Sequence, residues 1–449
     1  MNTRNTILSF SLIMLGACDG FLDQKPQSNL LIPQKAVELE QLLDATLLGI
    51  NSTPGILEMS TDNLHITEEG FLGLTLIERN AYAWQEDVYE FLGSDWSVPY
   101  QQILAANVVL EQAGEIVPEN SDDAELLIEL RGRALWMRSQ AYFQLLSAFA
   151  APYSPGSAND SPGVPLRLSP NVSTFVDRGT IGEDYDQITG DLELAIGLLP
   201  EYAEYKTRPS KISSHALLAR IYLAMEEYEK AGFHAGKVLE INNTLLDYSE
   251  LDLAARYPFS LFNDEVIHHL EMMNYRHMNS GLTFVDSTLV GMFGDNDLRK
   301  ELLFTPDEQG ISFDGNYSGS RVRFSGLATN EMYLISAECA ARRGDIGESM
   351  GILNTLLETR WVEGGFIPYT ASNSEEALRL ILMERRKELI FRGIRWTDLR
   401  RLNKDQRFAT LVTRKIGSES FEISPGSPRY VLPIPPEEIQ VSGIAQNPR

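Results

Sequence analysis

Cysteine and positive charge are both scarce in this chain of 449 residues. Its only cysteines are Cys18 and Cys339, and 38 lysines and arginines stand against 63 aspartates and glutamates. Two cysteines exclude a disulfide framework and a cysteine-based zinc site. The formal charge of −25 excludes nucleic acid as an expected partner, because such a chain cannot neutralise phosphates. Intrinsic disorder is excluded too, since 43% of the residues are hydrophobic.

Long hydrophobic runs are also lacking, and the one clear apolar run is at the N-terminus. Residues 7–15 are apolar, follow Arg4, and end in small residues before Cys18. The run is too short to span a bilayer, and its pattern is typical of a signal peptide cleaved before a cysteine that carries acyl chains such as palmitate. An ordinary secretory signal with a chance cysteine is the alternative. We predict a signal peptide over 1–17, lipid attachment at Cys18 and a tether over 18–30.

Helical periodicity dominates the rest of the chain. Apolar residues recur at i, i+3 and i+4 in four segments, and this spacing predicts helices over about 96–116, 124–150, 181–199 and 213–241. Ser121 or Asp122 is expected to cap the second of these segments. The sequence therefore indicates a mainly α-helical fold.

Two segments share a pattern of small residues around a short turn. Such residues let two helices approach closely, as in tetratricopeptide pairs, although any helical hairpin would show the same pattern. The copies lie 118 residues apart, from Ala219 to Ala337, so they do not form a tandem array. The residues are Ala219, Tyr222, Tyr228 and Ala231 in the first copy, and Ala337, Ala340, Gly344 and Ser349 in the second.

Two other segments, 52–96 and 260–323, lack a helical period and are rich in aromatic residues. They are predicted to be loop excursions from the helical scaffold, where function often lies. Exposed rings beside amides and carboxylates would form a platform for sugar rings, whereas buried rings would only fill the core. Burial is favoured for Trp96 and Tyr100. The candidate ligand-binding residues are Tyr82, Trp84, Tyr89, Trp96, Tyr275 and Tyr317.

The sequence lacks the common catalytic and metal-binding motifs. No nucleophile elbow, phosphate loop or paired-histidine zinc motif is present. His268, His269 and His277 do not favour a metal site, because adjacent residues of a strand face opposite sides. Cys339 lies on an apolar helix face and is expected to be a buried thiol. We therefore predict no enzyme activity, no metal and no cofactor.

Four blocks, taken in order, resemble the SusD/RagB family of outer-membrane lipoproteins. They are residues 18–26 at the mature start, the spacing of Trp96, Tyr100 and Asn107, residues 384–401, and residues 432–448. The 384–401 block carries Glu384, Arg385, Arg386, Trp396, Asp398 and Arg400. It is interpreted as one packed structural helix, in which Glu388 and Arg392 are spaced for an i, i+4 ion pair.

This resemblance implies a single SusD-like domain over 31–449, with interwoven parts at about 31–245 and 260–449. Its fold would be a tetratricopeptide-like scaffold of helical pairs with long irregular loop insertions. The implied function is non-catalytic binding of an oligosaccharide at the cell surface and its delivery to a SusC-like TonB-dependent outer-membrane transporter. Peptide binding by the same lid mechanism, a surface glycosidase and a purely structural adaptor are the alternatives.

Overall fold

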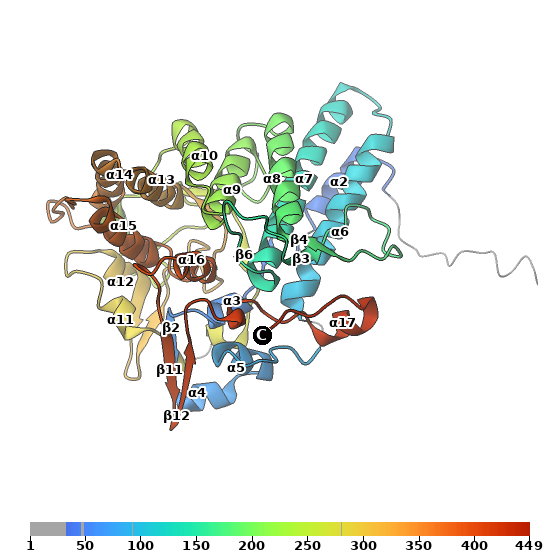
Figure 1. Cartoon of the computed structure of the whole chain (residues 1–449). Helices are drawn as coiled ribbons and strands as arrows, with labels where there is room; N and C mark the ends of the chain where they lie inside the picture. The colour runs from blue at the N-terminus through green and yellow to red at the C-terminus, as the bar shows by residue number, and fades with distance from the viewer. Residues whose placement is uncertain (1–32, 46–48, 92, 280) are drawn as a thin grey trace, which may run out of the picture.

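The computed structural model describes residues 33–45, 49–91, 93–279 and 281–449. The predicted signal peptide, Cys18, the predicted tether and the whole of the first family block lie outside these ranges. In Figure 1, the long helices form a row across the upper half of the molecule, and the short helices and small sheets lie beneath it. Each helix of the row, from α6 to α10 and then α13 to α15, contacts the next.

The helices are α2 (Ala36–Leu43), α3 (Ile56–Met59), α4 (Glu68–Gly73), α5 (Leu76–Tyr82), α6 (Ser94–Glu115), α7 (Ser121–Phe149), α8 (Ile181–Leu198), α9 (Lys211–Ala224), α10 (Tyr228–Ile241), α11 (Ser287–Val290), α12 (Arg299–Leu303), α13 (Thr329–Arg343), α14 (Ile346–Glu358), α15 (Ser374–Glu388), α16 (Arg395–Leu402) and α17 (Pro436–Ser442). The strands are β1 (Ser52–Thr53), β2 (Leu64–Ile66), β3 (Pro162–Pro165), β4 (Arg178–Thr180), β5 (Val266–His268), β6 (Glu271–Met272), β7 (Thr283–Val285), β8 (Phe304–Pro306), β9 (Ile311–Phe313), β10 (Leu327–Ala328), β11 (Val412–Ile416) and β12 (Glu419–Ile423). The mainly α-helical class is confirmed.

The predicted helices are confirmed as α6, α7, α8 and the pair α9 and α10. The predicted cap of α7 was wrong by one residue, because the Asn120 side chain, and not that of Ser121 or Asp122, accepts the N–H of Asp123. The 213–241 segment turns at Glu226, whose φ of +61° lies in the left-handed region. A helix cannot continue through that conformation, so the segment folds back as two packed helices.

The two small-residue copies form neighbouring helical pairs. α9 packs on α10, α13 packs on α14, and α10 packs on α13, so the copies join directly in space. A Cβ added at Gly232 would lie 3.1 Å from the Cβ of Cys339. The absence of a side chain at Gly232 therefore allows α10 and α13 to approach closely, and Cys339 is buried as predicted.

The two loop excursions are joined by small sheets. β1 pairs with β6 in parallel, and β2 pairs with β7 in antiparallel register. Each sheet of the described residues has two strands. These pairings place residues 52–66 beside residues 271–285, although about 200 positions separate them. The sheets therefore build one irregular layer beneath the helical row (Figure 1).

The 384–401 block is not one helix, so that prediction was wrong. α15 ends at Glu388, and α16 begins at Arg395. Between them, Phe391 has a φ of +54° and Gly393 a φ of +74°. The expected ion pair between Glu388 and Arg392 does not form. Because the chain leaves the helix between these residues, Glu388 turns toward Arg299 and Arg360, and Arg392 lies over the ring of Tyr317.

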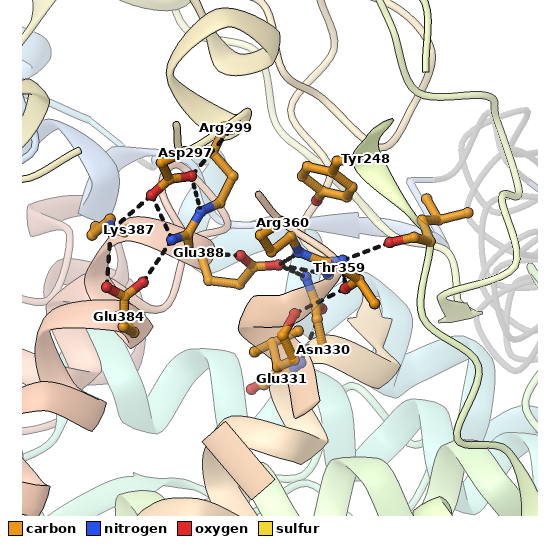
Figure 2. Close-up of polar contacts among 12 residues, drawn as sticks. Tyr248, Asp297, Arg299, Asn330, Glu331, Thr359, Arg360, Glu384, Lys387 and Glu388 are labelled. Atoms are coloured by element: carbon orange, nitrogen blue, oxygen red, sulfur yellow. Dashed lines mark hydrogen bonds and ion pairs between the residues drawn. The ribbon is translucent and has the colours of Figure 1, made fainter. Parts of the chain in front are cut away.

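Glu388 instead lies in a buried cluster of ion pairs (Figure 2). It accepts hydrogen bonds from Arg299 at 3.0 Å, from Arg360 at 2.9 Å and from Asn330 at 2.8 Å, and it lies between the two arginines. Burial by itself raises the pKa of Glu388, but the charges of Arg360 and Arg299 outweigh it and lower the pKa to about 2. The block therefore holds α12, α13 and α15 together through charge pairing.

Further charged residues of the block form ion pairs as well. Lys387 bridges Asp297 and Glu384, at 2.9 and 2.8 Å, as Figure 2 shows. Arg385 binds Asp398 at 2.8 Å. Arg386 lies 3.1 Å from Asp62, which belongs to the 52–96 excursion. No helix of the described ranges is long and apolar enough to cross a membrane.

Candidate functional site

A cavity of about 660 Å³ lies where the two loop excursions meet. It is larger than two further cavities of about 360 and 330 Å³. Its wall combines Glu58 and Leu64 from the first excursion, residues from 253 to 323, and Phe391 from the turn between α15 and α16. Three segments that are distant in sequence therefore assemble one recess, which we call the excursion pocket.

Glu58 is a buried acidic group in the wall of the excursion pocket. Its Oε1 accepts hydrogen bonds from Thr61 and Asn63, each at 3.1 Å, and its Oε2 accepts the N–H of Gly393 at 3.2 Å. Burial raises the pKa of Glu58. Because both oxygens already bind protein groups, Glu58 fixes the turn at Gly393 against the first excursion.

Arg323 supplies a half-buried positive charge in the same wall. Its guanidinium lies 4.7 Å from the centre of the Phe313 ring and 4.8 Å from that of Phe391, and it donates to the carbonyl of Phe313 at 3.2 Å. Burial lowers the pKa of Arg323 to about 10, so the group stays positive at neutral pH. The two rings hold the cation in a fixed position.

The remaining wall carries groups that can meet a ligand. Arg256 and Arg321 are exposed, and Tyr257 is half-buried with the guanidinium of Arg256 5.3 Å from its ring centre. Asp314 accepts the hydroxyl of Thr305 at 2.9 Å. A half-buried ring beside guanidinium, carboxylate and hydroxyl groups can stack on the apolar face of a sugar and bond its hydroxyls.

The aromatic platform predicted from the sequence is not formed. Tyr82, Trp84 and Tyr89 are only 1% to 6% exposed. Arg414 covers the first two, with its guanidinium 3.8 Å from the Tyr82 ring centre and 4.3 Å from that of Trp84. The Nε1 of Trp84 donates to the carbonyl of Ser60 at 3.0 Å. These rings therefore fill the core and offer no face to a ligand.

Trp96 and Tyr317 are also buried, against the prediction that they bind a ligand. Trp96 packs edge-on against Phe149, with ring centres 4.9 Å apart, which agrees with the burial that the sequence favoured for it. The Tyr317 hydroxyl donates to Glu265 at 2.6 Å. Tyr275 is half-buried, and its hydroxyl donates to Asp95. None of the three lines the excursion pocket.

The sequence reasoning missed Arg256, Tyr257, Arg321 and Arg323. The two later arginines lie at the end of the predicted 260–323 excursion, and the other two residues immediately precede it. The only available signal was their position in or beside an aperiodic segment. Their grouping brings two stretches about 65 positions apart to one wall, and local sequence does not encode that contact.

The early family motif holds α6 against the segment that contains β3. The Tyr100 hydroxyl donates to the carbonyl of Pro165 at 3.1 Å, and the Asn107 amide donates to that of Arg167 at 2.8 Å. Arg138 on α7 donates to Asn107 Oδ1 at 2.9 Å. In the 384–401 block, Arg400 donates to the carbonyls of Leu146 (3.3 Å) and Ser147 at the end of α7. These contacts are structural.

The histidines His268, His269 and His277 each contact a different side chain. His268 packs against Trp136, with ring centres 4.2 Å apart, while His269 lies 3.4 Å from Glu271 and His277 3.2 Å from Glu78. No group of three or more histidine, cysteine, aspartate or glutamate residues is placed to hold a metal ion in the part of the chain that the structure describes.

Comparison with known proteins gives matches to two family profiles. The profile described as "Starch-binding associating with outer membrane" matches residues 20–223, and the profile described as "SusD family" matches residues 319–449. A curated SusD-like protein of Formosa agariphila is 23% identical over 426 residues, covering 78% of this chain and 79% of that protein.

Solved structures share the fold. A SusD superfamily protein of Bacteroides thetaiotaomicron has a TM-score of 0.76 at 20% identity and covers 92% of this chain and 100% of its own. A SusD superfamily protein of Bacteroides vulgatus has a TM-score of 0.75 at 22% identity, covering 93% and 99%. A laminarin-binding SusD-like protein has a TM-score of 0.68 at 20% identity, covering 93% and 100%.

Proposed function

The chain belongs to the SusD/RagB family, a family of carbohydrate-binding proteins, and we propose that it binds an oligosaccharide in the excursion pocket without cleaving it. The observation that carries this proposal is the wall itself, in which Tyr257 and the exposed Arg256 and Arg321 surround a recess of about 660 Å³. A volume of this size suits a small ligand. The relative that binds laminarin supports a glucan as the first candidate ligand.

The proposal includes a location and a partner. The protein is anchored to the outer membrane through acyl chains on Cys18, and residues 18–30 form the tether. It presents the bound oligosaccharide to a SusC-like TonB-dependent transporter. The family description, which places such proteins at the outer membrane, supports this part.

Non-catalytic binding is supported by the chemistry of the pocket wall. The buried carboxylate, Glu58, already accepts three hydrogen bonds from the protein and so has no oxygen reserved for a reacting atom. A glycosidase needs two carboxylates that face the scissile bond. The other carboxylates of the wall, such as Asp314, can accept hydrogen bonds from the hydroxyls of a sugar.

Calorimetry with a panel of oligosaccharides, including laminarin fragments, and of peptides tests the binding proposal. We expect one class of glycan to bind, and Tyr257→Ala to weaken its affinity about 2- to 13-fold, because one stacked ring contributes about 0.5–1.5 kcal/mol. Tyr202→Ala is the matched control, since Tyr202 is also an accessible tyrosine but does not line the pocket. It should leave the affinity unchanged.

Two outcomes would contradict the proposal. The first is the absence of heat with every glycan when circular dichroism shows a folded chain; heat with peptides alone would make the protein a peptide binder. The second is the appearance of new reducing ends during incubation with the bound glycan, which would make the protein a glycosidase.

The anchor is tested separately. We expect Cys18→Ser to release the protein from the membrane fraction while its far-ultraviolet circular dichroism and glycan affinity stay unchanged. Retention of this variant in washed membranes would exclude lipid attachment at Cys18. Co-purification of the wild-type protein with a TonB-dependent transporter from detergent extracts tests the proposed partner.

A further inference from the structure

A further and much smaller cavity lies among α7, α9, α15 and α16. Its volume is about 20 Å³, which suffices for one water molecule or one small ion. Arginine dominates the charged part of the wall. The charged lining residues are Arg220, Arg385, Arg392, Arg401 and Asp398, and each of them is only 3% to 8% exposed.

Carboxylates offset the charge of three of these arginines but not of the fourth. The ion pairs are Arg220 with Glu331 (2.6 Å), Arg385 with Asp398 (2.8 Å) and Arg401 with Glu338 (2.6 Å). In the described ranges, no carboxylate forms an ion pair with Arg392, whose guanidinium lies 3.9 Å from the centre of the Tyr317 ring. An uncompensated buried charge is costly, so this cavity favours a negative occupant.

The hydrogen-bonding groups of the wall also favour an anion. Two lining residues carry buried groups for which the described residues supply no partner, namely Nη1 of Arg385 and the hydroxyl of Ser147. Asp398 is already engaged, because its two oxygens accept the Nε–H of Arg385 at 2.8 Å and that of Arg401 at 2.9 Å. Arginine donates and never accepts. A water molecule would bring two more donors, whereas an anion only accepts.

We propose that this cavity binds one small monovalent anion of the halide class, such as chloride. The anion accepts hydrogen bonds from Arg385 and Ser147 and offsets the charge of Arg392. Ser147 lies on α7 and Arg220 on α9, whereas the other arginines follow in α15, α16 and the turn between them. Occupancy therefore stabilises the contact between the N-terminal helices and the C-terminal block.

The test is the dependence of thermal unfolding on halide at constant ionic strength. Sodium gluconate is replaced stepwise by sodium chloride or bromide, and Tm is followed by circular dichroism. A ligand that binds only the folded state stabilises it by an amount that grows with its concentration above Kd. We expect Tm of the wild-type protein to rise by about 2 °C at a halide concentration tenfold above Kd.

Ser147→Ala removes one proposed ligand at little cost in volume. We expect it to raise the halide concentration that gives half of the Tm shift about 10- to 150-fold, the loss expected for one hydrogen bond to an ion. Ser214→Ala is the matched control, because Ser214 is buried on α9 and its hydroxyl donates to the carbonyl of Ser210 at 2.9 Å. Equal shifts in all three proteins would indicate a general salt effect and overturn the proposal.

Crystallography supplies a second readout. In crystals grown with bromide, an anomalous peak is expected within hydrogen-bonding reach of Arg385 Nη1 and the Ser147 hydroxyl. A peak without anomalous signal would identify water and would also overturn the proposal. Arg392→Met should abolish both the peak and the halide dependence; if this variant does not fold, the comparison of Ser147→Ala with Ser214→Ala decides.

Discussion

Replacing Glu388 with glutamine removes one charge from the buried cluster of Figure 2 and leaves the side-chain volume nearly unchanged. The pKa of this carboxyl falls from 4.5 to about 2 in the folded protein. Each pKa unit corresponds to about 1.4 kcal/mol between the charged and the neutral form, so the shift corresponds to about 3 kcal/mol. Glutamine resembles the neutral acid, and we expect Glu388→Gln to lower the free energy of unfolding by about that amount at pH 7.

Urea denaturation of the chain without residues 1–17, followed by tryptophan fluorescence, measures this loss. Glu375→Gln is the matched control. Glu375 pairs with Arg379 at 2.8 Å on the same helix, but its side chain is 47% exposed. Exposed pairs contribute about 0.2–1 kcal/mol, so the control should lose less than about 1 kcal/mol. Equal losses in the two variants would refute the view that the cluster derives its energy from burial.

The pH dependence of the same difference gives a second and independent check. Because the folded pKa of Glu388 is lowered, its stabilising contribution is fully present above the unfolded value of 4.5 and is lost as the pH falls toward 2. The gap in unfolding free energy between wild type and Glu388→Gln should therefore shrink between pH 4.5 and pH 2. A constant gap across this range would show that the glutamine variant loses packing and not charge.

Two further predictions concern the helical row, and a third concerns His268 on β5. Gly232→Val should lower the free energy of unfolding by about 1–3 kcal/mol, measured by urea denaturation, because its Cβ would meet that of Cys339 at 3.1 Å; Cys339→Gly in the same chain should recover part of this loss. Gly344→Ala should cost about 1 kcal/mol in the same assay, since Gly344 ends α13 at a φ of +91°, and no loss would contradict the capping role. Burial lowers the pKa of His268 to about 3, so the unfolded chain binds the proton first as the pH falls below 6.5; stability should decline from pH 6.5 toward pH 3, and His268→Phe should remove that part of the decline.

Local sequence predicted most of the helical scaffold. The apolar period of residues 124–150 was enough to place α7, and small residues around a turn were enough to place the pairs α9–α10 and α13–α14. These elements depend on contacts within a few residues, which a sequence pattern records directly. The prediction of one helix over residues 384–401 failed because the break at Phe391 and Gly393 depends on distant partners. One of them is Glu58, which accepts the N–H of Gly393.

Aromatic residues show the limit of such reasoning most clearly. Aromatic residues such as Tyr82 and Trp84 are equally suited to a sugar-binding platform and to a hydrophobic core. Arg414 makes these two rings part of the core, because it covers both of them and donates to the carbonyl of Tyr82. It lies 332 positions after Tyr82 in the chain. No pattern within residues 52–96 predicts the contact with that side chain.

The sequence by itself determined that this is an acidic, mainly helical chain of the SusD/RagB type, with paired helices interrupted by two aperiodic excursions. Only the tertiary structure decided where a ligand can bind. The wall of the excursion pocket joins Glu58, Tyr257, Arg323 and Phe391. Strands of one excursion hydrogen-bond to strands of the other, and Glu58 binds the turn that contains Phe391 through the N–H of Gly393. Backbone pairing of this kind is set by the whole fold, and the side chains it gathers have no common local signal.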